Sequence, residues 1–206
     1  MFFRPGEHKD HGLPHNPFKS LVVPRPIGWI TSLAGDGTLN LAPFSYFNAV
    51  ADDPPIVLFA PSGRQRDDWI KDTLHNVEET GEFVCNMATW DLREEMNKTS
   101  AMVAPDVDEA EMTGLEMTPS KFVKPPRVAA SPVHMECKYL KTVEFPTNRP
   151  EGRCYVCFGE VVGIHIDDAV INEKGLVDVT RFKPIARLGY MEYAVVEDVF
   201  VMHRPE

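Results

Sequence analysis

A run of small polar side chains lies between two apolar segments near the start of this 206-residue chain. Thr31 and Ser32 end an apolar stretch, a Gly-Asp-Gly turn follows, and Asn40 and Ser45 lie in the returning segment. Hydroxyls and an amide on rigid strands can hydrogen-bond a polar, planar ligand. This hairpin is therefore the first candidate binding site.

A second candidate site lies where a helix is predicted to begin, at Lys71, Asp72 and Thr73. A helix N-terminus presents unpaired N–H groups and a partial positive charge, so a lysine and a hydroxyl there can bind a phosphate. The alternative is that Asp72 and Thr73 are ordinary capping residues, which are commoner than phosphate sites. Ser62 and Arg64, which follow an apolar strand, would add a hydroxyl and a cation.

Composition limits the classes of partner. The formal net charge of -10 argues against binding to nucleic acid or to an anionic membrane surface. No apolar run approaches the ~18 residues of a membrane span, and the N-terminus lacks a secretory signal, so a cytoplasmic protein is expected. The common phosphate-binding motifs G-x-G-x-x-G and G-x-x-x-x-G-K-[ST] and the hydrolase motif G-x-S-x-G are absent.

The elements expected from the residue pattern are mostly strands. The predicted strands are Ser20–Leu33, Leu39–Ser45, Ile56–Ala60, Glu82–Ala88, Val133–Tyr139, Cys154–Ile166 and Ile185–Val196. The predicted helices are a helix from residue 72 to Gly81, one from a capping box at Asp91–Glu94 to Thr99, and a short one over Asp108–Gly114 within an excursion over the sheet. Because strands and helices do not alternate, we predict a closed or nearly closed antiparallel barrel, with the last strand closing the sheet. Residues 1–18 are expected to form an arm, and 19–206 one domain.

Several blocks resemble the flavin reductase-like family, whose members have the FMN-binding split-barrel fold. The blocks are RPIGWITS (25–32), NLAPFSYF (40–47), DPPIV (53–57), Lys71-Asp-Thr73 with Asn76, and Arg187-Leu-Gly189. They follow the family's order and cover nearly the whole chain. The resemblance implies a mainly β fold, an antiparallel split β-barrel with a few short peripheral helices.

The resemblance also implies a function. A member of this family would be an FMN-binding oxidoreductase that transfers hydride from NADH or NADPH to flavin and supplies reduced flavin to a partner monooxygenase or another acceptor. It would be a homodimer with one FMN per subunit near the dimer interface. Because the cofactor carries the reaction, no catalytic side chain is expected. The alternatives are a non-catalytic flavin-binding or carrier protein on the same scaffold, and a protein-interaction module without a cofactor.

The resemblance assigns site residues as well. The implied cofactor-binding set is Thr31, Ser32, Asn40, Ala42, Pro43, Phe44, Ser45, Asn48, Ser62, Arg64, Lys71, Asp72 and Thr73. Within it, residues 31–32 match positions beside the flavin and its ribityl chain, and 42–45 match the strand that runs along the ring. Ser62 and Arg64, with Lys71 and Thr73, match the phosphate end. Tyr46, Phe47 and Asn48 would lie near the ring or the partner subunit.

The remaining candidate groups are interpreted as structural. Cys154 and Cys157 form a C-x-x-C, but residues three apart on a strand point to opposite faces, so we interpret them as packed cysteines. No histidine pair has metal-ligand spacing, and no metal site is expected. His134 is interpreted as a surface histidine, with an approach to the flavin pocket as the alternative. The acidic run near Asp108 is interpreted as a solvated helix face.

Overall fold

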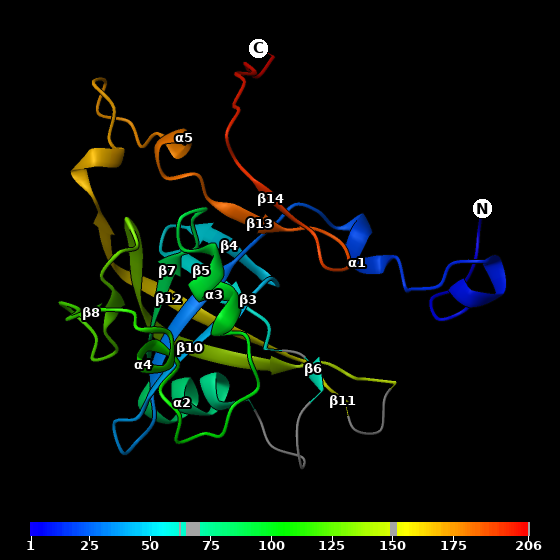
Figure 1. Cartoon of the computed structure of the whole chain (residues 1–206), viewed down its shortest axis with the longest axis horizontal. Helices are drawn as coiled ribbons and strands as arrows, with labels where there is room; N and C mark the ends of the chain where they lie inside the picture. The colour runs from blue at the N-terminus through cyan, green and yellow to red at the C-terminus, as the bar shows by residue number, and fades with distance from the viewer. Residues whose placement is uncertain (62, 65–70, 149–151, 206) are drawn as a thin grey trace.

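A seven-stranded antiparallel sheet organises the structure of this chain, a computed structural model that describes residues 1–61, 63–64, 71–148 and 152–205 (Figure 1). Across the sheet the order is β3 (Leu39–Phe44), β2 (Gly28–Leu33), β7 (Glu82–Met87), β10 (Val133–Glu144), β12 (Tyr155–Ile166), β5 (Pro55–Phe59) and β4 (Phe47–Asp52). The helices are α1 (Phe18–Leu21), α2 (Asp72–Thr80), α3 (Arg93–Lys98), α4 (Glu109–Thr113) and α5 (Val179–Phe182), with 3-10 turns η1 (His8–His11) and η2 (Asp168–Val170). The mainly β, antiparallel split-barrel fold is thus confirmed.

Side chains are buried on both faces of the sheet, in two core clusters. In β2, Trp29 and Ile30 are neighbours in sequence and point to opposite faces, and both are fully buried. Ile30 packs with Phe83 and with Val77 of α2, whereas Trp29 packs in the cluster that contains Leu41. Since both faces are covered, this strand is apolar without the alternation of a half-exposed strand.

Two glycines show how strongly the sheet curls. A Cβ on Gly159 of β12 would lie 2.3 Å from the Phe83 ring, which comes from β7, beyond the intervening β10. A Cβ on Gly28 of β2 would lie 2.5 Å from the ring of Phe47, which begins β4 at the far edge. The rings therefore fill the inside of the curled sheet, and glycine is needed where they touch the backbone.

The last predicted strand does not close this sheet, so that prediction is wrong. Residues 185–196 contain two short strands, β13 (Ile185–Arg187) and β14 (Tyr193–Val195), which form a separate sheet in the order β1-β13-β14. The predicted strand Ser20–Leu33 is also wrong as one element, because α1, β1 (Arg25–Pro26) and β2 divide it. Proline has no N–H for a ladder, so the prolines at 24 and 26 interrupt the strand.

Arg25 holds this second sheet to the N-terminal segment. Its buried guanidinium donates hydrogen bonds to the carbonyl oxygens of Lys19, Val22 and Leu188, at 2.7 Å for the last two. Burying an arginine is tolerated where its donors meet carbonyl oxygens. Arg25 therefore connects α1, β1 and the β13–β14 turn.

Most other predicted elements are confirmed within a residue or two, and two errors have local causes. The capping box at Asp91–Glu94 is wrong, because Leu92 is the N-cap of α3 and no side chain of the described residues caps it. The strand β4 was not predicted, because its residues after Phe47 are all exposed and show no alternation. No helix in the described residues is long and apolar enough to cross a membrane.

The contact between Gly159 and Phe83 gives a stability prediction. We expect Gly159→Ala to lower the free energy of unfolding by about 1–3 kcal/mol, because the new methyl overlaps a fully buried ring. Urea denaturation measures the change. Most of the loss should disappear in the Phe83→Leu background, where the ring is absent.

Gly163→Ala, on the same strand, is the matched control. Its Cβ would meet the ring of Phe122, which is 62% exposed and can rotate away, so the loss should be small. Equal losses for the two glycine variants would contradict this account of the curled sheet.

Candidate functional site

The side-chain amide of Asn40 is the centre of a buried hydrogen-bond network. Its Oδ1 accepts hydrogen bonds from the hydroxyls of Thr73, at 2.5 Å, and Ser32, at 3.4 Å. Asn76 of α2 donates to the Ser32 hydroxyl at 3.3 Å. All four of these side chains are buried. Three predicted site residues, Ser32, Asn40 and Thr73, are therefore brought together, and they join β2 and β3 to the first turn of α2.

The Thr73 hydroxyl of this network lies at the start of α2 and does not cap the helix. The N-cap residue is Lys71, which makes no capping hydrogen bond, and the Thr73 hydroxyl is used by Asn40. No side chain of the described residues caps the helix, so neither Asp72 nor Thr73 is the cap expected under the simpler interpretation. N–H groups of the first turn beside a lysine suit an anion such as phosphate.

Glu109 completes the network, although no local pattern in the sequence assigned it to the site. Its carboxylate accepts hydrogen bonds from the Asn40 side-chain N–H and from the backbone N–H of Leu41, both at 2.9 Å. Glu109 is 4% exposed, so the interpretation of this acidic run as a solvated helix face is wrong for Glu109, whereas Asp106 and Glu111 are exposed. Burial raises the pKa of Glu109 to about 7, although the Leu41 N–H opposes the rise, and Asp72 adds to it by repulsion.

Thr31 lies on the other face of β2 and belongs to a different network. Its hydroxyl accepts a hydrogen bond from the Asn86 side chain at 2.6 Å, and Asn86 in turn accepts one from the Val128 N–H at 2.8 Å. Thr31 is fully buried, as is Ser32. The structure therefore does not bring these two predicted site residues together, because successive side chains of a strand point to opposite faces.

The interpretation of His134 as a surface histidine is wrong, because His134 is 4% exposed. Its Nε2 is 2.9 Å from the Val128 carbonyl oxygen, and burial lowers its pKa to about 4, so the ring is neutral at pH 7. His165 lies beside it and bonds the fully buried carboxylate of Glu136. Burial would raise the pKa of Glu136, but backbone N–H groups of Lys121 and Phe122, with His165, hold it below its usual range.

The residues predicted to lie along the ring form the end of β3 and the start of β4. Ala42, Pro43 and Ser45 are half-buried, and Phe44 is buried against Phe59 in the core. Asn48 is exposed on β4, where its side chain accepts a hydrogen bond from the next backbone N–H at 2.9 Å. The structure thus offers half-buried backbone at residues 42–45.

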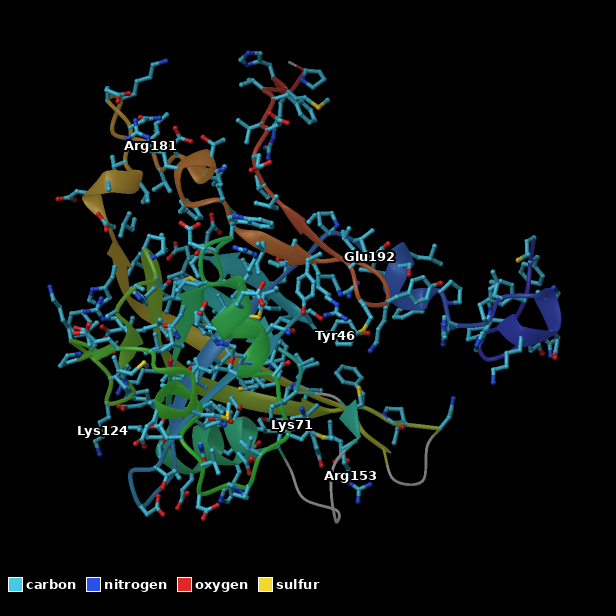
Figure 2. All side chains as sticks on the ribbon, viewed as in Figure 1. Tyr46, Lys71, Lys124, Arg153, Arg181 and Glu192 are labelled. Carbon is cyan, nitrogen blue, oxygen red and sulfur yellow. The ribbon has the colours of Figure 1, made fainter. Side chains whose placement is uncertain are left out.

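The predicted phosphate end is described only in part. Ser62 lies outside the described residues, and for Arg64 the structure describes the backbone, in β6 (Gly63–Arg64). This strand pairs with β11 (Gly152–Arg153), which adds an arginine that the sequence analysis did not assign. In Figure 2, Arg153 lies on this projecting ladder and Lys71 lies toward the same side of the view. Lys71 is thus a cation at the helix start itself, in a chain of net charge -10.

One small apolar pocket of about 80 Å³ lies between the two sheets. It is lined by Pro26, Ile27, Phe47, Cys85, Asn86, Met87, Val133, Met135, Pro184 and Ile185. Cofactor pockets usually measure ~300–1,000 Å³. This pocket is therefore too small for a flavin.

Comparisons with known proteins place the chain in a family. A family model described as flavin reductase like domain matches residues 20–186. An uncharacterized protein of Aquifex aeolicus is 43% identical over 173 residues, covering 84% of this chain and 85% of its own length. The YwrF protein of Bacillus subtilis is 35% identical and covers 89% of each chain.

Solved structures are similar as well. Nitrilotriacetate monooxygenase component B from Bacillus cereus is 29% identical, with a TM-score of 0.87 over 98% of each chain. The 2-nitrobenzoate 2-nitroreductase of Pseudomonas fluorescens is 33% identical, with a TM-score of 0.79 over 91% of this chain and 88% of that one. The chain thus resembles these proteins over nearly its full length.

The raised pKa of Glu109 predicts a pH dependence of stability. Because the folded-state pKa of about 7 exceeds the ordinary value of 4.5, the folded state binds the proton more tightly. This contribution to stability is complete below pH 4.5 and is lost as the pH rises through 7. Glu109→Gln removes the titration, so the stability difference, wild type minus variant, should fall by about 2–3 kcal/mol from pH 5 to pH 8.

Chemical denaturation of the cofactor-free protein at several pH values measures this difference. Glu111→Gln is the matched control, because Glu111 lies on the same helix with an exposed side chain. A difference between wild type and Glu109→Gln that stays constant from pH 5 to pH 8 would show that Glu109 does not titrate in this range.

Proposed function

Since the chain belongs to the flavin reductase-like family, we propose that it binds FMN and transfers hydride from NADH or NADPH to this flavin. The observation that carries the proposal is the start of α2, where Lys71 and first-turn N–H groups that no described side chain caps are fixed against β3 by Asn40 and Thr73. This arrangement suits the phosphate that distinguishes FMN from riboflavin. Flavin-related oxidoreductase chemistry follows from the family, and the nicotinamide donor is the proposed part.

The residues of this chain have separate roles in the proposed complex. Lys71 and the first N–H groups of α2 would hold the phosphate, with Arg64 as a second cation. Residues 42–45 would face the ring with their backbone, held in place because Phe44 is anchored in the core. Ser32, Asn40 and Thr73 are buried, so we assign them the role of fixing the helix start. Thr31 and Asn48 stay proposed contacts. FMN supplies the redox chemistry when bound, and no side chain needs to exchange a proton.

The proposed function has two versions, which differ in the electron acceptor. The similar structures are described as a monooxygenase component and as a nitroreductase, so either a partner monooxygenase or a small nitro compound is a candidate acceptor. We propose a homodimer with FMN near the dimer interface, as the family resemblance implies. A cytoplasmic location stays a prediction. The competing function is a flavin carrier without turnover.

Lys71→Ala is expected to weaken FMN binding by about 1.5–3 kcal/mol, the range for a hydrogen bond to a charged group. Quenching of flavin fluorescence measures the dissociation constant. Lys124→Ala is the matched control, because Lys124 is an exposed lysine that Figure 2 shows on the other side of the view. Equal affinities of Lys71→Ala and wild type would remove Lys71 from the site.

Anaerobic stopped-flow mixing tests turnover. Protein loaded with FMN should lose its absorbance at about 450 nm after addition of NADH or NADPH. The loss should be faster than that of free FMN at the same concentration. Bound FMN that is bleached no faster than free FMN would support the carrier function. Protein that binds no FMN would contradict both the oxidoreductase and the carrier function. It would support a protein-interaction module without a cofactor.

A further inference from the structure

Glu109 reaches the site from a segment outside the sheet. It is the first residue of α4, whose N-cap Asp108 accepts hydrogen bonds from the backbone N–H groups of Ala110 and Glu111, at 2.8 and 3.0 Å. Ala110 is 1% exposed and packs in the same core cluster as Leu41 of β3. The start of α4 is thus fixed by the Asp108 cap and by the packing of Ala110. The Glu109 carboxylate therefore has little freedom to turn away from Asn40.

Glu109 determines which way the Asn40 amide points. One Glu109 oxygen accepts from the amide nitrogen, which an ionised carboxylate and the carbonyl oxygen of a protonated carboxyl can both do, and the amide oxygen then faces the Thr73 hydroxyl. The opposite orientation would set the amide oxygen against the carboxylate, which is repulsive. Two hydrogen bonds therefore connect the Glu109 carboxyl to the first turn of α2.

The charges around Glu109 are mostly negative. The strand β3 carries no titratable side chain, α4 contributes Asp108, and α2 contributes Asp72 with Lys71 before it. Burial and these carboxylates place the pKa of Glu109 near 7, so its charge changes close to neutral pH. A phosphate bound at the start of α2 would add negative charge to the same corner, and because Glu109 itself is buried, its charge is screened less than a surface charge would be.

We propose that Glu109 is a positioning residue for the flavin phosphate: it orients Asn40 and Thr73 at the start of α2, and its charge controls how tightly a phosphate-bearing flavin is held. The inference rests on the proposed function, because it requires FMN at this helix start. A protonated Glu109 permits tight binding, and deprotonation weakens it. The excursion that carries α4 thereby couples flavin retention to pH.

The test compares FMN with riboflavin, which lacks the phosphate, by fluorescence titration at pH 7.0 and 8.5. A phosphate monoester has its second pKa near ~6, so FMN is already mostly dianionic over this range. Wild-type affinity for FMN should fall about three- to tenfold, below the limit of about tenfold per pH unit that one proton sets. Riboflavin affinity should change less than about twofold.

Glu109→Gln should bind FMN with an affinity that changes less than about twofold over the same range, because an amide does not titrate. Glu111→Gln is the control and should follow wild type. The cofactor-free unfolding curves of each variant show whether it is folded at both pH values. If Glu109→Gln does not fold, the wild-type comparison of FMN with riboflavin still decides the matter.

The outcomes distinguish a failure of the role of Glu109 from a failure of the proposed function. Binding of FMN with no pH dependence, or with one that riboflavin or Glu109→Gln shares, overturns the role of Glu109 and leaves the proposed function standing. A protein that binds neither flavin overturns both. A fall in affinity confined to FMN and abolished in Glu109→Gln supports the inference.

Discussion

The candidate site depends on one buried amide. Asn40 accepts hydrogen bonds from Thr73 and Ser32 and donates one to Glu109, so a single side chain joins α2, β2, β3 and α4. A buried amide must have partners for its donors and its acceptor, since an unsatisfied one costs about 1–3 kcal/mol. That requirement fixes where α2 begins relative to the sheet.

The consequence is a rigid helix start that no side chain in the described part of the chain caps. Thr73 would serve as an ordinary capping residue in many helices, but its hydroxyl is used by Asn40. The N-cap is Lys71, whose side chain cannot accept a hydrogen bond from the backbone. The arrangement therefore combines fixed N–H groups with a cation in a chain of net charge -10, which is what local recognition of a phosphate requires.

Much of the fold could be predicted from the sequence, because the signals were local: β7 was placed by alternation, and the end of α2 by Gly81. The errors concern contacts that no local pattern shows. Glu109 meets Asn40 across 69 residues, and its burial could not be distinguished from an exposed acidic turn. The separation of Thr31 from Ser32, by contrast, follows from strand alternation and was available from the sequence.

The central claim is that the amide held by Glu109 prepares the first turn of α2 for phosphate. Amide nuclear magnetic resonance of the labelled protein tests it most directly. On addition of FMN, the backbone N–H signals of Asp72 and Thr73 should move strongly, and riboflavin should leave them almost unchanged. Saturation with FMN that leaves both signals in place, or equal shifts with riboflavin, would contradict the account.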